Sequence, residues 1–197
     1  VLSRDWSFGR FVGRSPQVRD LEESVRKVAT TDLPVLIEGE TGTGKELLAQ
    51  AIHRACARRD KPFLAVNCSA IPELLLETEL FGHNKGAFTG ATQEHKGLFQ
   101  AADGGTLFLD EVPSLSLPVQ AKVLTAIENN RIRRVGGNKE IPVDARVVAA
   151  ANCDLKEAVA QGRFREDLLH RLDLYRLQIP PLRERPSDIP LLVKHFL

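Results

Sequence analysis

The sequence predicts an α/β fold built on a parallel sheet of five strands with helices on both faces. Five short apolar runs alternate along the 197 residues with segments whose apolar side chains recur at helical spacing. These runs are apolar almost without a break, which is typical of strands covered on both faces rather than on one.

The expected elements alternate between strand and helix. A first amphipathic helix begins near Ser15 and Pro16, a common helix start, and carries apolar side chains at Val18, Leu21, Val25 and Val28. Strands are expected at residues 34–38, 63–66, 106–110, 146–151 and 175–179. Further helices are expected at residues 45–58, 71–81 and 119–128.

Three parts are expected along the chain. Residues 1–11 form a linker, residues 12–186 the α/β domain, and residues 187–197 the start of a further helical part. The stretch 179–190 marks the boundary because its prolines interrupt regular structure. Since the sequence starts on Val1 and stops on Leu197 within a helical pattern, we expect a piece of a longer polypeptide.

Composition sets limits on partners and surroundings. The 27 basic and 26 acidic side chains nearly balance, so no overall field draws the chain toward nucleic acid. The three cysteines, Cys56, Cys68 and Cys153, lack metal-type spacing and are expected to be buried thiols in a reducing compartment. Without a long apolar run or a signal-peptide pattern, we expect a cytoplasmic protein with no membrane contact.

Residues 39–46 have the spacing of a phosphate-binding loop: glycine, four residues, glycine and lysine. The segment lies between an expected strand and an expected helix, as this motif requires. Its glycines let backbone N–H groups face the phosphates, and Lys45 reaches the β- and γ-phosphates. The expected nucleotide-binding residues are Gly39, Glu40, Thr41, Gly42, Thr43, Gly44, Lys45 and Glu46.

Glu46 departs from the usual motif. Most phosphate loops have a serine or threonine at this position, whose hydroxyl ligates magnesium. Two roles for Glu46 remain open: it holds the metal through water, or its side chain points away from the site.

Two adjacent carboxylates end the third expected strand. Asp110 is the candidate ligand of Mg²⁺, and Glu111 is the candidate that polarises the attacking water. An acidic pair at a strand end is usually a solvated turn, but its position downstream of a phosphate loop favours the functional interpretation. The sequence therefore predicts hydrolysis of ATP to ADP with Mg²⁺ as cofactor.

Asparagines follow two other strands. Asn67 ends the second strand and Asn152 follows the fourth. Such residues are ordinarily turn formers, yet open α/β sheets bind their ligands at the carboxyl ends of strands. Both are therefore candidates for contacting the γ-phosphate or the attacking water.

A glycine-bracketed aromatic residue marks a further loop. The segment reads Gly86, Ala87, Phe88, Thr89, Gly90 and Ala91. Its glycines predict a mobile, projecting loop, and two interpretations remain open from composition: a surface hairpin with Phe88 folded back, or a loop that binds a partner.

This hexapeptide resembles the signature loop of the sigma-54-dependent transcription activators, a branch of the AAA+ superfamily of P-loop NTPases. The resemblance extends over nearly the whole chain, through the segments 39–46, 79–83, 104–111, 134–137 and 164–172. Members of this family also have glutamate after the loop lysine. The resemblance thus implies that Asp110, water and the phosphates hold the metal.

What the family implies is an ATP-driven ring, commonly a hexamer, with the nucleotide between neighbouring subunits. Phe88 and Thr89 would engage sigma-54, and movement of their loop during hydrolysis would remodel the RNA polymerase that carries it. DNA would be bound only by domains outside this chain. Arg165 and Arg171 match the family's arginine fingers, although composition alone favours surface ion pairs for them. The remaining matches are Asn67 as the residue that switches Glu111, Asn152 as the first sensor, and Val12 and Gly13 as adenine contacts.

Members of the family continue after residue 185 into a helical lid, which is missing here. We therefore expect the chain alone to bind nucleotide weakly, to hydrolyse it poorly and to be mostly monomeric. Alternatives are an AAA+ remodeller of another partner and a nucleotide-responsive scaffold without turnover; Phe88 with Thr89 argues against the first and Asp110 with Glu111 against the second. Direct DNA binding would rest on Arg131, Arg133 and Arg134 alone, which fit a ring pore or a hairpin face better.

Overall fold

Five parallel strands form the central sheet, and each coincides with one of the apolar runs. The computed structural model describes residues 7–8 and 11–197. Its strands run in the hydrogen-bonded order β11-β3-β10-β7-β4, with every pairing parallel. They are β3 (Val35–Glu38), β4 (Phe63–Asn67), β7 (Thr106–Asp110), β10 (Arg146–Ala151) and β11 (Arg176–Gln178). The predicted α/β class and the five-stranded parallel sheet are confirmed.

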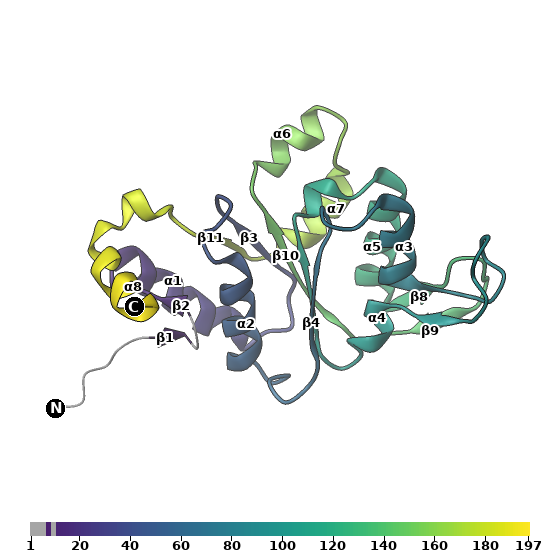
Figure 1. Cartoon of the computed structure of the whole chain (residues 1–197), viewed down its shortest axis with the longest axis horizontal. Helices are drawn as coiled ribbons and strands as arrows, with labels where there is room; N and C mark the ends of the chain where they lie inside the picture. Colours follow the sequence, from purple (N-terminus) through teal and green to yellow (C-terminus); the bar gives the residue numbers. More distant parts are fainter. Residues whose placement is uncertain (1–6, 9–10) are drawn as a thin grey trace.

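Helices cover both faces of this sheet, as Figure 1 shows. Alternate strand residues enter two separate cores, so that Val35 and Ile37 pack with α1 and α2, while Leu36 faces the opposite side with α3, α5 and α7. This two-sided burial explains why the runs lack a polar face. The helices are α1 (Pro16–Ala29), α2 (Lys45–Ala55), α3 (Glu73–Phe81), α4 (Leu98–Ala101), α5 (Leu117–Asn129), α6 (Leu155–Ala160), α7 (Glu166–Leu172) and α8 (Ile189–Phe196).

Helix α2 ends three residues before its predicted end. Cys56 has an extended backbone, with ψ 172°, and its N–H donates to the carbonyl of His53. Arg58 lies beyond this break and reaches away from the helix, to Asp32 and Asp144. The early end of α2 therefore coincides with the ion pairs of Arg58 to distant residues, which helical spacing in the sequence does not reveal.

The expected linker is partly folded. Strand β1 (Ser7–Phe8) pairs antiparallel with β2 (Phe11–Val12), and Phe11 is only 3% exposed within the core of α1 and α2. Phe11 therefore belongs to the domain, which corrects the linker expectation at that residue. Residues 1–6 and 9–10 of the expected linker lie outside the described residues.

Two further hairpins project from the domain. One joins β5 (Gly82–His83) to β6 (His95–Lys96), and the other joins β8 (Arg131–Arg133) to β9 (Glu140–Pro142). Arg131 and Arg133 both pair with Glu140 on the exposed face of the second hairpin. Their pairing agrees with a hairpin face rather than with a free basic patch.

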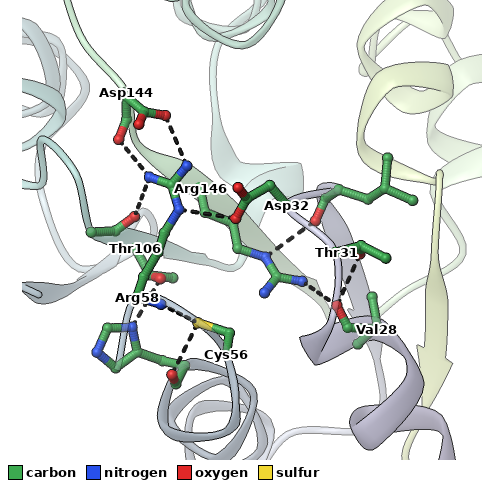
Figure 2. A network of polar contacts seen from close by, with 11 residues as sticks. Val28, Thr31, Asp32, Cys56, Arg58, Thr106, Asp144 and Arg146 are labelled. Atoms are coloured by element: carbon green, nitrogen blue, oxygen red, sulfur yellow. Dashed lines mark hydrogen bonds and ion pairs between the residues drawn. The ribbon is translucent and has the colours of Figure 1, made fainter. Parts of the chain in front are cut away.

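A polar network fastens the amino-terminal edge of the sheet, as drawn in Figure 2. Arg146 is only 2% exposed, and its Nη2 and Nε donate to the carbonyls of Val28 at 2.9 Å and Leu33 at 3.3 Å. Because Val28 lies in the last turn of α1, this cation meets one carbonyl at the negative end of the helix. The network holds α1 against the start of β10.

The proline-rich stretch lacks long regular elements, as predicted, but it docks on the domain. Two short 3-10 turns, η2 (Leu182–Glu184) and η3 (Pro186–Asp188), lead into α8, which lies beside β2 (Figure 1). Asp188 is fully buried and accepts hydrogen bonds from the N–H groups of Arg14 and Ser15 at 2.7 and 2.8 Å, and from the Ser15 hydroxyl at 2.8 Å. This carboxylate joins segments 173 residues apart.

The cysteines are distributed differently from the prediction. Cys56 and Cys68 are buried thiols, whereas Cys153 is exposed because it lies in the loop that follows β10. None of the helices in the described part of the chain is long and apolar enough to cross a membrane.

Candidate functional site

The phosphate loop connects β3 to α2, as the motif requires. Gly42 and Gly44 have φ of 84° and 97°, a left-handed backbone that glycine adopts without strain. Gly44 precedes α2, whose first turn has no side-chain cap, so backbone N–H groups at the positive end of the helix remain available to an anion.

Lys45 is drawn into this loop. Its side chain is only 6% exposed, and Nζ donates to the carbonyls of Gly39 at 3.0 Å and Glu40 at 3.4 Å. The same ammonium lies 3.5 Å from the carboxylate of Glu111. The lysine thus connects the phosphate loop to the acidic end of β7.

Glu46 faces away from this connection. Its carboxylate accepts a hydrogen bond from Gln50 Nε2 at 3.1 Å on the exposed side of α2. Of the two roles left open by the sequence, the arrangement agrees with a side chain that points outward.

The two carboxylates lie at the carboxyl end of β7. Asp110 is its last residue, and the Asp110 carboxylate accepts the Glu111 N–H at 3.0 Å. Glu111 has φ 54°, a left-handed conformation that costs a non-glycine residue roughly 1–3 kcal/mol. Such strain is concentrated at functional sites, and the sequence contained no signal of it.

Both candidate asparagines lie at the same edge of the sheet. Asn67 is directly opposite Asp110 in the β4–β7 register, and its side chain accepts two hydrogen bonds from Ser69. Asn152 follows β10, the strand between β3 and β7, and the preceding carbonyl of Ala151 accepts the Gly39 N–H at 3.2 Å. The fold therefore brings the carboxyl ends of β3, β4, β7 and β10 to one site.

A cleft of about 850 Å³ opens beside the phosphate loop. One wall is the loop itself, a second contains Phe11 and Val12, and the third belongs to the segment 181–197. Gly13, the residue after Val12, is closely packed, since an added Cβ would come 2.9 Å from Val18 and 3.1 Å from Asp188.

The third wall contains residues that sequence reasoning missed. Arg183 forms a bidentate ion pair with Glu40, at 2.6 and 2.9 Å, and this pairing lowers the pKa of the Glu40 carboxyl. Arg185 lies deeper, against Phe11 and the carbonyl of Thr43. Only the proximity of this stretch to the phosphate loop in three dimensions reveals these contacts.

Arg165 and Arg171 lie on the surface, at α7. Arg165 precedes the helix and pairs with Asp167 at 2.7 Å, while Arg171 pairs with Glu128 at 3.1 Å. The side chains of both pairs are about half exposed. Within one chain they form the ion pairs that composition favours, and both guanidinium groups are accessible from outside.

The glycine-bracketed loop forms a closed tip between β5 and β6. Its ends meet through the hydrogen bond from Gly86 N–H to the Ala91 carbonyl at 2.8 Å. The Phe88 ring packs edge-on against His83 at 5.0 Å and remains 41% exposed. Behind the loop, Gly136 lies so close that an added Cβ would come 2.7 Å from that of Ala87. Phe88 is thus folded back and still presented to solvent.

These features define the class of the chain: an AAA+ P-loop NTPase core, with its phosphate loop, its acidic strand end and β10 between the two. The sequence matches the Sigma-54 interaction domain over residues 11–178, and the chain belongs to this family.

Relatives and solved structures agree with this membership. The chain is 54% identical over 195 residues to the DNA-binding transcriptional activator HyfR of Escherichia coli, covering 99% of this chain and 29% of that protein. It is 53% identical over 186 residues to the transcriptional regulatory protein GlrR of Escherichia coli, covering 94% and 42%. NtrX from Brucella abortus in complex with ATP superimposes with a TM-score of 0.87 at 38% identity, covering 93% of this chain and 40% of that one. The chain thus spans less than half the length of these proteins.

Proposed function

We propose that this chain binds and hydrolyses ATP, and that the full-length protein uses the turnover to remodel RNA polymerase carrying sigma-54. The observation that carries the proposal is the 3.5 Å contact between Lys45 and Glu111, because it supports a site in which a phosphate-binding lysine lies beside the candidate base. Support also comes from the family membership and from NtrX, whose structure was solved with ATP.

Each candidate residue has a role in this proposal. The backbone N–H groups of residues 39–46 and Lys45 bind the phosphates, and Val12 and Gly13 form the side that receives the base. Glu111 accepts a proton from the attacking water as the water oxygen bonds to the γ-phosphorus and the bond from that phosphorus to the β–γ bridging oxygen breaks, so that ADP and phosphate are released. Asn67 and Asn152 orient that water and respond to the loss of the γ-phosphate.

The acidic residues fit a magnesium ion that is held together with the nucleotide. Within the described residues, no group of three or more His, Cys, Asp or Glu side chains is placed to hold a metal. Mg²⁺ is commonly bound by one or two carboxylates together with water and substrate phosphates, and Asp110 supplies such a carboxylate. When bound, the ion neutralises negative charge on the β- and γ-phosphates.

The proposed active form is a ring, commonly a hexamer in this family. Arg165 and Arg171 would reach the nucleotide of a neighbouring subunit, for which their exposure on α7 leaves them accessible. The loop 86–91 would engage sigma-54 through Phe88 and Thr89. DNA would be bound by parts of the full-length protein outside this chain.

The test begins with turnover. In the full-length protein, Glu111→Gln should keep ATP affinity and reduce hydrolysis at least about 100-fold, because it removes the proton acceptor while preserving shape. Hydrolysis retained at the wild-type rate would exclude Glu111 as the base.

A second experiment addresses the partner. The full-length protein is trapped with ADP and a metal fluoride and tested on a native gel for retention of purified sigma-54. Retention that is lost with Thr89→Ala supports the assignment. Absence of retention together with intact hydrolysis would indicate an AAA+ remodeller of another partner.

A further inference from the structure

A buried cation lines the nucleotide cleft but takes no part in the proposed hydrolysis. Arg185 is only 6% exposed and lines the cleft between the phosphate loop and β2. The centre of its guanidinium lies 5.6 Å from the centroid of the Phe11 ring, and Nη2 is 3.4 Å from the carbonyl of Thr43. Its Nε is buried and has no hydrogen-bond partner among the described residues.

Burying this cation lowers the stability of the folded chain unless a partner compensates the charge. Burial lowers the pKa of Arg185, and the charge of Asp188 only partly opposes the effect. The Asp188 carboxylate, however, is hydrogen-bonded to Arg14 and Ser15. Buried donors are nearly always satisfied in folded proteins, so the partnerless Nε of a side chain that lines the cleft indicates an acceptor that enters from the cleft.

We infer that Arg185 is a nucleotide-binding residue that contacts the part of the ligand shared by ATP and ADP. The inference rests on the proposed function, since it takes a nucleotide as the occupant. Lys45 and Glu111 mark the end of the site where the γ-phosphate is cleaved. Arg185 instead touches Phe11, next to Val12 on the base side, and Thr43 within the phosphate loop.

The chemistry of arginine suits this position better than that of lysine. A planar guanidinium stacks on an aromatic face and still offers donors at its edge, which can reach a sugar hydroxyl or a phosphate oxygen. A nucleotide would thus supply the missing acceptor. Arg185 would in turn hold β2 and the phosphate loop on the same ligand.

The test measures the Kd of fluorescent ATP and ADP analogues for the full-length protein. Arg185→Met keeps the stem and removes the donors, so the Kd of both nucleotides should rise about tenfold or more, by the same factor. Arg59→Met removes a charge whose exposed pair with Asp60 lies outside the cleft lining, and it should leave both Kd values within about twofold of wild type.

Three outcomes overturn the inference. Affinities of Arg185→Met within about twofold of wild type would reduce Arg185 to a structural residue, and a larger loss for ATP than for ADP would place it at the γ-phosphate. If Arg185→Met fails to fold, Arg185→Lys replaces it, since lysine keeps the charge and most of the packing. The Kd of Arg185→Lys for both nucleotides should still rise at least about threefold, because lysine lacks the planar fork of donors. An unchanged Kd in folded Arg185→Lys is the third outcome that overturns the inference. A wild-type protein that binds neither nucleotide would instead refute the proposed function.

Discussion

Replacing Asp188 with alanine should destabilise the domain more than any exposed acidic substitution. The carboxylate is fully buried and accepts three hydrogen bonds, two from the N–H groups of Arg14 and Ser15 and one from the Ser15 hydroxyl. It also supplies the negative charge that opposes the burial of Arg185. Truncation removes all of these interactions at once and leaves the donors inside the protein.

The magnitude follows from the donors left behind. Each buried donor without a partner costs about 1–3 kcal/mol, and three donors lose the Asp188 carboxylate. Because water can enter the space vacated by the carboxylate, we expect Asp188→Ala to lower the free energy of unfolding by about 3–5 kcal/mol. Asp188→Asn keeps an acceptor for the two N–H groups and should cost about 1–2 kcal/mol.

Urea denaturation of the chain, followed by circular dichroism, measures these differences. Asp154→Ala is the matched control, because Asp154 caps α6 through a single exposed hydrogen bond to the N–H of Lys156 and should cost only about 1 kcal/mol. If Asp188→Ala costs no more than this control, with an unchanged denaturant slope, the carboxylate does not fasten the two ends of the chain.

Three further predictions concern pH, metal and assembly. Burial lowers the pKa of His53 from its unfolded value of 6.5, so between 6.5 and the lower folded pKa the unfolded chain binds more protons than the folded chain. The free energy of unfolding should therefore fall as pH drops through this window, and it should fall less in His53→Gln. Urea midpoints at pH 5 and 7 measure this difference. Glu46→Thr should leave the Mg²⁺ dependence of ATP hydrolysis unchanged, because Glu46 faces outward toward Gln50; an altered half-saturating Mg²⁺ concentration would give it a metal role. Mixing Arg171→Ala with Lys45→Ala subunits of the full-length protein should restore part of the ATPase rate if the arginine acts on a neighbour, whereas a rate never above either variant alone would contradict action between subunits.

Local patterns predicted those parts of the fold that short-range physics determines. The five strands were predictable because each is a short run of apolar residues buried on both faces, as Val35, Leu36 and Ile37 illustrate. The phosphate loop was predictable because glycine spacing constrains the backbone directly. From parallel strands alone it followed that Asn67 and Asp110 would meet at one edge, and the β4–β7 register places them opposite each other.

Features that depend on distant contacts were not predictable in the same way. The early end of α2 accompanies the reach of Arg58 to Asp144, a residue far along the chain. The left-handed conformation of Glu111 has no local signature, since glutamate has no preference for positive φ. The sequence predicts a linker at Phe11 because a single aromatic residue outside a periodic pattern does not indicate whether its side chain is buried in the core.

The stretch 179–190 shows how a sequence feature can have two consequences. Its prolines do prevent a long helix or strand, so the expected interruption is present. Irregular backbone, however, still needs hydrogen-bond partners, and here Asp188 obtains them from the residues that precede α1. That contact places Arg185 over Phe11 and against the phosphate loop. The nucleotide cleft therefore has walls from both ends of the chain, and its complete form depends on tertiary folding rather than on the phosphate-loop motif alone.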